Sequence, residues 1–155
     1  MPITQPAIAR PDARIAPSGG VYLGAGVYNL TGSNQTALVQ VSPGQTYAFG
    51  IKIQNSGNQA DTLQLKGKCN NPSFAVRYFK GATGTTDITA DVTGGNYFTA
   101  SLAPGAITSK AEMIRMEVTV PPGLGGPIAV KVLLKAFSTA DGSKIDVVKA
   151  KLVLP

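Results

Sequence analysis

The side chains that usually carry out protein chemistry are scarce in this sequence. Its 155 residues include no histidine and a single cysteine, Cys69. Without histidine, neither a Ser-His-Asp triad nor a Cys-His pair can form, and histidine-containing zinc sites are excluded as well. One cysteine cannot make an intrachain disulfide or a zinc site of cysteines alone. With no histidine base to activate it, Cys69 is interpreted as an inert, packed thiol.

Carboxylate pairs are the remaining candidates for acid–base or metal chemistry. Glu112 and Glu117 are five residues apart in a stretch expected to be a strand, so their side chains should point to opposite faces. Asp87 and Asp91 are four residues apart and could hold a cation between them, although we favour solvation of a turn or a sheet edge. The sequence therefore predicts a protein that is not an enzyme, with no catalytic residue, metal site or cofactor.

Short polar side chains beside predicted turns are expected to bond the local backbone. Asn55 and Asp61 flank the predicted hairpin turn, and a structural role is favoured for both. Asp141-Gly142 is a turn signal on the same argument.

The net charge of +6 favours contact with an acidic surface, whether nucleic acid, lipid or an acidic protein shell. Several basic residues fall at alternating positions of predicted strands: Arg115, Lys131, Lys135, Lys149 and Lys151. Nucleic-acid binding would require exposed aromatic residues among them, but aromatic residues make up only 6% and tryptophan is absent. A solvated lysine face is the favoured interpretation. The aromatic candidates for a carbohydrate platform are Tyr22, Tyr28 and Tyr97.

An alternating stretch at residues 44–61, GQTYAFGIKIQNSGNQAD, organises the predicted fold. Tyr47, Phe49, Ile51 and Ile53 share one parity, which is typical of a strand with one buried face. The polar turn that follows leads into a second alternating run at residues 62–65, so a β-hairpin is predicted.

Further short strands are predicted along the rest of the chain, at 37–41, 74–79, 87–92, 97–102, 114–120, 128–135 and 145–154. A loop is expected at 66–72, and the glycine-rich loop at 19–32 lacks the pattern of a phosphate-binding loop. Eight or nine strands at this spacing indicate an all-β, antiparallel, two-sheet sandwich in one domain. No apolar run is long enough for a transmembrane helix, and residues 1–17 lack a recognisable secretory signal.

The first residues are expected to form an extended arm. Pro2, Pro6, Pro11 and Pro17 prevent a helix, so we predict an arm over residues 1–16, ending in an edge strand at 12–16, before a sandwich over 17–155. The arm residues expected to make assembly contacts are Ile3, Ile8, Arg10, Arg14 and Ile15.

Several fragments resemble the immunoglobulin-like repeat modules of large bacterial surface and secreted proteins. They are PDARIAPSGGVYLGAGVYN, GQTYAFGIKIQNSGNQAD, FAVRYFKG, DITADVTGG, YFTASLAPG and DVVKAKLVL. The resemblance implies a two-sheet sandwich acting as a non-catalytic spacer or binding module, and it transfers no functional residues. The layout of a lone sandwich with an arm is also similar to phage capsid decoration proteins, many of which are immunoglobulin-like.

Two functions follow as hypotheses. The first is a structural subunit of a multi-copy assembly, most specifically a capsid decoration protein on a virion surface. Its arm would contact copies of the protein or a capsid shell protein, without membrane insertion. The second is an adhesion or carbohydrate-binding module that is secreted or on a bacterial cell surface. It would bind through loops around Tyr22, Tyr28 and Tyr97.

Overall fold

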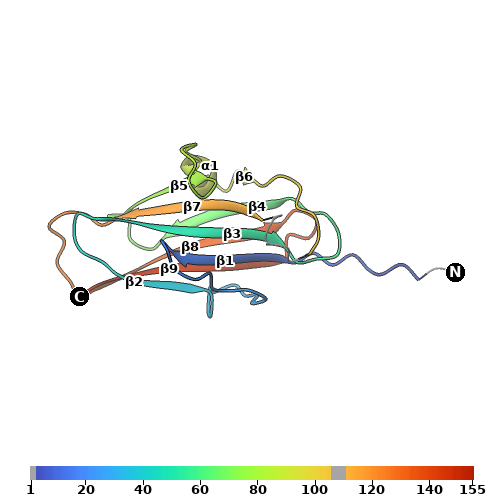
Figure 1. Cartoon of the computed structure of the whole chain (residues 1–155), viewed down its shortest axis with the longest axis horizontal. Coiled ribbons are helices and arrows are strands. Elements are labelled where there is room, and N and C mark those ends of the chain that lie inside the picture. Colours follow the sequence, from blue (N-terminus) through green and yellow to red (C-terminus); the bar gives the residue numbers. More distant parts are fainter. Residues whose placement is uncertain (1–2, 106–110) are drawn as a thin grey trace.

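The computed structural model describes residues 3–105 and 111–155, and its strands are arranged in two layered sheets (Figure 1). The first sheet contains, in spatial order, β1 (Pro11–Pro17), β3 (Thr46–Asn55), β7 (Glu112–Thr119) and β5 (Ala75–Lys80). The second contains β2 (Thr36–Gln40), β9 (Ile145–Leu154), β8 (Ile128–Ser138), β4 (Leu63–Cys69) and β6 (Tyr97–Phe98). This confirms the predicted all-β sandwich.

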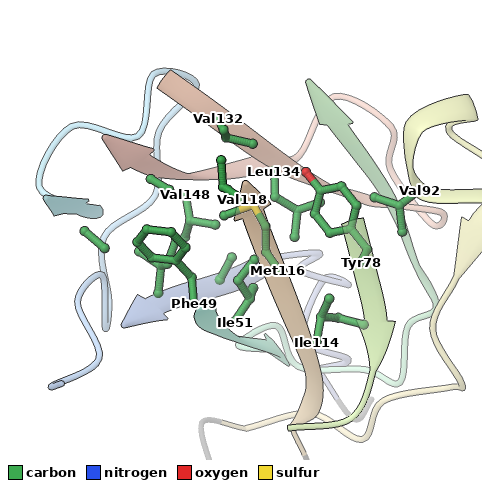
Figure 2. Packing of buried hydrophobic residues seen from close by; sticks show 14 of the residues in the cluster. Phe49, Ile51, Tyr78, Val92, Ile114, Met116, Val118, Val132, Leu134 and Val148 are labelled. Carbon is green, nitrogen blue, oxygen red and sulfur yellow. The ribbon is translucent and has the colours of Figure 1, made fainter. Parts of the chain in front are cut away.

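Alternation along the strands explains the two layers. In β3, Phe49, Ile51 and Ile53 are completely buried, whereas the residues between them face away from the core. Side chains from both sheets, such as Met116 of the first and Leu134 of the second, point toward one another and fill the interior (Figure 2). Burial of these apolar side chains is the main favourable contribution to folding, at roughly 2 kcal/mol for each large residue.

The strand order is that of an immunoglobulin domain. Lettered in the usual way, β1, β3, β7 and β5 correspond to the A-B-E-D sheet, and β9, β8 and β4 correspond to G-F-C. One ladder departs from the antiparallel pattern, because β2 runs parallel to β9 at the edge of the second sheet. Within the described residues, no helix has the length and apolar character needed to cross a membrane.

The hairpin predicted over residues 44–65 is wrong. β3 pairs with β1 and β7, whereas β4 pairs with β8 and β6 in the other sheet. Both strands have the predicted alternation, but the turn at residues 56–61 carries the chain from one layer to the other. The prediction failed because alternation identifies the buried face of a strand and does not identify its partner.

Two local predictions are also corrected. Residues 87–92 were expected to form a strand, but α1 (Thr89–Gly94) occupies this segment. Ile88 and Val92 are both buried, and residues four apart share a face in a helix as well as in a strand. Gly95 ends the helix in a left-handed conformation with φ 73°.

The loop predicted at 66–72 is largely strand, because β4 continues to Cys69. Gly67 hides the alternation, since it supplies no side chain at an inward position. The hydroxyl of Tyr78, from the opposite sheet, lies where a β-carbon of residue 67 would be.

Candidate functional site

The part of the arm that precedes β1, residues 3–10, is anchored by Asn58. Its side-chain oxygen accepts a hydrogen bond of 2.7 Å from the Ile8 amide, and its side-chain nitrogen donates to the Pro6 carbonyl at 2.8 Å. The Asn58 amide donates to the Ile8 carbonyl at 3.1 Å, and the Ser56 amide donates to Arg10 at 2.8 Å. Residues 3–5 make no backbone hydrogen bond to the rest of the described chain, and the arm runs away from the sandwich (Figure 1).

The five residues expected to make assembly contacts are in two different environments. Ile3 is 98% exposed and Ile8 39%, and Arg10 is exposed with its guanidinium 5.2 Å from the centre of the Tyr28 ring. Arg14 and Ile15 instead belong to β1, where Ile15 is completely buried in the core. The extended segment that is free to meet a partner is therefore residues 3–10, because pairing with β3 places residues 11–17 in the first sheet.

Two shallow cavities lie on either side of the arm at this end of the sandwich. One, of about 500 Å³, lies between Ala7–Ala9, Gln59–Asp61 and Ala140–Gly142. The other, of about 540 Å³, lies between Ile8–Pro11, Tyr28–Leu30 and Ser143–Ile145. Of the side chains named as candidates in the sequence, Ile8, Arg10 and Tyr28 meet here.

Asn55 and Asp61 hold the turn beside the arm in place. The Asn55 side chain donates to the carbonyls of Gln59 at 2.6 Å and Leu102 at 3.0 Å, and its oxygen accepts from the Gly57 amide at 2.9 Å. Asp61 is buried and accepts hydrogen bonds from the hydroxyl of Ser138 and the amide of Ala140. Asn55 bonds the local backbone, as predicted, whereas the Asp61 side chain has a structural role at the distant turn after β8.

A buried carboxylate that the sequence did not reveal lies between the sheets. Asp146 of β9 accepts hydrogen bonds from the Ala13 amide at 2.8 Å, the Gln35 side chain at 2.6 Å and the Asn29 amide at 3.2 Å. Burial raises the pKa of this carboxyl above its usual value, and these hydrogen bonds partly offset the rise. Because its partners come from β1 and from the loop between β1 and β2, Asp146 has a structural role.

The carboxylate pairs singled out in the sequence do not form an acid–base site. Glu112 accepts a hydrogen bond of 3.0 Å from the Tyr97 hydroxyl, whereas Glu117 contacts Arg115 at 3.1 Å on the outer face of β7. Asp87 contacts Arg77 at 2.9 Å. Hydrogen bonds from Thr89, together with Arg77, lower the pKa of Asp87 to about 2. No cluster of three potential metal ligands exists within residues 3–105 and 111–155.

Cys69 lies half-buried at the end of β4 and donates to the carbonyl of Asn71 at 3.2 Å. Burial raises the pKa of its thiol, which keeps it protonated at neutral pH. The geometry fits the interpretation of a packed, unreactive thiol.

The three tyrosines proposed as a carbohydrate platform do not share one site. Tyr22 lies over Gly50 and under the Lys52 ammonium, which is 4.1 Å from the centre of its ring. Tyr97 is buried against Glu112, and Tyr28 lies in the cavity beside the arm. Tyr28 is the most exposed of the three, at 40%, and Tyr22, which is less exposed, lines a separate cavity of about 330 Å³.

The basic residues singled out in the sequence divide between the two sheets. Arg115 lies on the outer face of the first sheet, 4.5 Å from the centre of the Phe79 ring. The other four lie on the outer face of the second sheet: Lys131, Lys135, Lys149 and Lys151. Lys66 and Lys68 of β4 lie on the same face, and sequence reasoning missed them because it placed both in a loop.

No family model and no curated protein matches this chain. Among solved structures, the N-terminal domain of PorA is similar over 92% of this chain and 96% of its own length, with 13% identity and a TM-score of 0.56. A family 123 glycoside hydrolase from Clostridium perfringens is similar over 94% of this chain, with 7% identity and a TM-score of 0.49. This chain spans 27% of that hydrolase. At these identities the similarity to PorA concerns the fold, a β-sandwich domain.

Proposed function

We propose that this protein is a non-enzymatic structural subunit of a multi-copy assembly and that it docks through residues 3–10. The arm carries the proposal, because it holds exposed apolar side chains on a segment that leaves the sandwich. Ile3 is 98% exposed, and covering such a side chain is favourable by roughly 2 kcal/mol. The Asn58 anchor holds residues 6–8 and fixes the direction in which the arm leaves, so on binding only residues 3–5 remain to be ordered.

The arm would bind by lying in extended form against a neighbouring protein. Main-chain groups of residues 3–5 have no partner in the described chain and are available for strand-like pairing. Ile3 and Ile8 would supply the apolar contacts and Arg10 the charge. Among multi-copy assemblies we favour a capsid, with this protein on the virion surface as a decoration protein bound to the shell or to copies of itself.

A truncation tests the proposal. Removal of residues 1–10 leaves β1 intact, so the truncated protein should unfold at the same temperature as the full chain but should lose its multimeric species. Size-exclusion chromatography with light scattering measures the molar masses of the full chain and of the truncated protein. A full chain that is monomeric, or a truncated chain with unchanged multimers, would contradict self-assembly through the arm.

A matched pair of substitutions distinguishes docking through the arm from non-specific hydrophobic association. Ile3→Ser should weaken assembly, whereas Val21→Ser, which changes an apolar residue that is 79% exposed on another loop, should leave it unchanged. Equal effects of both substitutions would indicate non-specific association instead of docking through the arm.

A second candidate function is an adhesion or carbohydrate-binding module of a secreted or cell-surface protein. It is favoured by Tyr28, which is 40% exposed in a cavity of about 540 Å³ together with Arg10 and Asn29. The two ends of the described chain also leave from opposite ends of the sandwich, a geometry that suits modules joined end to end (Figure 1). Glycan-array binding that is lost in Tyr28→Ala would support this function, and an empty array would contradict it.

A further inference from the structure

The outer face of the second sheet carries an uncompensated cluster of positive charge. It includes six of the chain's ten lysines, two from each of three adjacent strands: Lys66 and Lys68 of β4, Lys131 and Lys135 of β8, and Lys149 and Lys151 of β9. We call this set the lysine face. None of the three ion pairs found in the described residues involves any of its members.

The strand register arranges these lysines around one apolar residue. Lys68, Leu133 and Lys149 form the middle row, Lys131 is opposite Lys151 in the row on one side, and Lys66 is opposite Lys135 in the row on the other. A depression of about 310 Å³ lies between Leu133, Lys68, Lys135 and Asn70. Three strands and three rows cover about 10 by 14 Å, so the charged area extends in two dimensions.

The arrangement costs the isolated molecule free energy. Like charges directly opposite each other on neighbouring strands are destabilising, and the register contains two such pairs, Lys66 with Lys135 and Lys131 with Lys151. Lysines spread over the surface would avoid this repulsion. A surface that brings anions to all six ammonium groups would remove it.

The two edge strands add exposed apolar side chains to the same face. Leu38 of β2 is opposite Lys151 and is 61% exposed, and Phe98 of β6 is opposite Gln64 and is 51% exposed. The lysine face is therefore bordered on both sides by apolar residues that point in the same direction as the ammonium groups.

We propose that the lysine face binds the headgroup plane of an anionic lipid bilayer, with the sandwich lying on the membrane without spanning it. A flat, two-dimensional array of point charges matches the planar potential of acidic lipids, to which each nearby lysine is attracted independently. Leu38 and Phe98 would reach the interfacial layer on either side. Arginine, which provides bidentate phosphate recognition, is absent from the paired positions of this face.

Vesicle co-sedimentation at low ionic strength tests the proposal. The full chain should bind vesicles containing phosphatidylglycerol and should not bind vesicles of phosphatidylcholine alone, and added salt should release it. Lys131→Gln with Lys151→Gln should weaken binding roughly 30-fold. The matched control, Lys80→Gln with Lys144→Gln, removes the same charge from exposed positions outside the lysine face and should change binding only a few-fold.

Each other outcome would overturn the proposal. Equal losses in the two double variants would mean that net charge, not this face, drives binding. Equal binding to neutral vesicles would remove the role of the lysines. Binding of a soluble polyuronate, with no binding to acidic vesicles, would assign the face to a polyanionic chain instead. The Lys131→Gln, Lys151→Gln variant should not lose thermal stability, because it removes a like-charge pair.

Discussion

The outer faces of the two sheets handle charge differently. On the first sheet, three arginines each contact a carboxylate: Arg14 with Asp12 at 3.6 Å, Arg77 with Asp87 at 2.9 Å, and Arg115 with Glu117 at 3.1 Å. Arg77 and Arg115 also lie over the Phe79 ring, at 4.9 and 4.5 Å from its centre. On the second sheet, six lysines have no such partner within the described residues.

The difference shows that each arginine of the first sheet already has its charge balanced within the molecule, whereas Lys52, opposite Arg14, lies over the Tyr22 ring. Charges paired with neighbours and packed on an aromatic ring gain little from an external anion, because the anion would have to replace contacts already made. The lysines of the second sheet have no ion pair that an approaching anion would have to replace. The two faces share one core and differ only in their outward side chains, so the first sheet is an internal control for the second.

The largest expected effect tests whether Asp146 holds the two sheets together. Asp146 of the second sheet accepts hydrogen bonds from Ala13 in β1 and from Gln35, so Asp146→Ala would leave several buried donors unsatisfied. We expect a loss of about 4 kcal/mol in the free energy of unfolding, measured with urea. Asp91→Ala, at an exposed carboxylate in α1, should cost about 0.5 kcal/mol or less. Equal losses would show that Asp146 does not join the two layers.

Two charge reversals, one on each sheet, should change the stability of the protein in opposite directions. Lys151→Glu places a carboxylate opposite Lys131 and should stabilise the protein by about 1 kcal/mol. Glu117→Lys removes the contact with Arg115 and places a lysine opposite Arg77, so it should destabilise the protein by a similar amount, about 1 kcal/mol. Chemical denaturation at low salt measures both changes, and high salt should shrink them. If Lys151→Glu is destabilising, the lysine face carries no repulsion to relieve.

The sequence predicted the layers better than it predicted the lysine face. Alternation identified most strands, because one buried face imposes a period of two. It could not separate helix from strand at Ile88 and Val92, since residues four apart share a face in both. Gly67 interrupted the pattern of β4, so Lys66 and Lys68 were assigned to a loop.

The lysine face also depends on which strands are neighbours. Lys131 and Lys151 are opposite each other only because β8 pairs with β9, and no local pattern encodes that pairing. The arm was predicted from its prolines, but the burial of Ile15 follows from its pairing with β3. Strand partners are set by packing of the whole chain, which is why these features emerge only in three dimensions.

The smallest expected effect concerns acid and the Asp87 carboxylate beside the first sheet. Thr89 and Arg77 lower the pKa of Asp87 to about 2, below the value of 3.8 expected in the unfolded chain. The folded state therefore binds this proton less readily, so Asp87 contributes stability above about pH 4 that is lost as the pH falls toward 2. Asp12 and Asp146 act in the opposite sense and in a higher window. Burial raises their pKa values, so stability falls as the pH rises from about 4.

Comparing wild type with Asp87→Asn isolates the contribution of Asp87. The difference in urea midpoint should be present at pH 5 and should shrink as the pH falls through the window between about 4 and 2. The same comparison for Lys131→Gln should show no change across this window, because Lys131 has no carboxylate partner among the ion pairs of the described residues. A midpoint difference for Asp87→Asn that stays constant from pH 5 to pH 2 would mean that Asp87 gains nothing from its charge. The Arg77–Asp87 ion pair would then not stabilise the first sheet, and it would no longer distinguish that sheet from the lysine face.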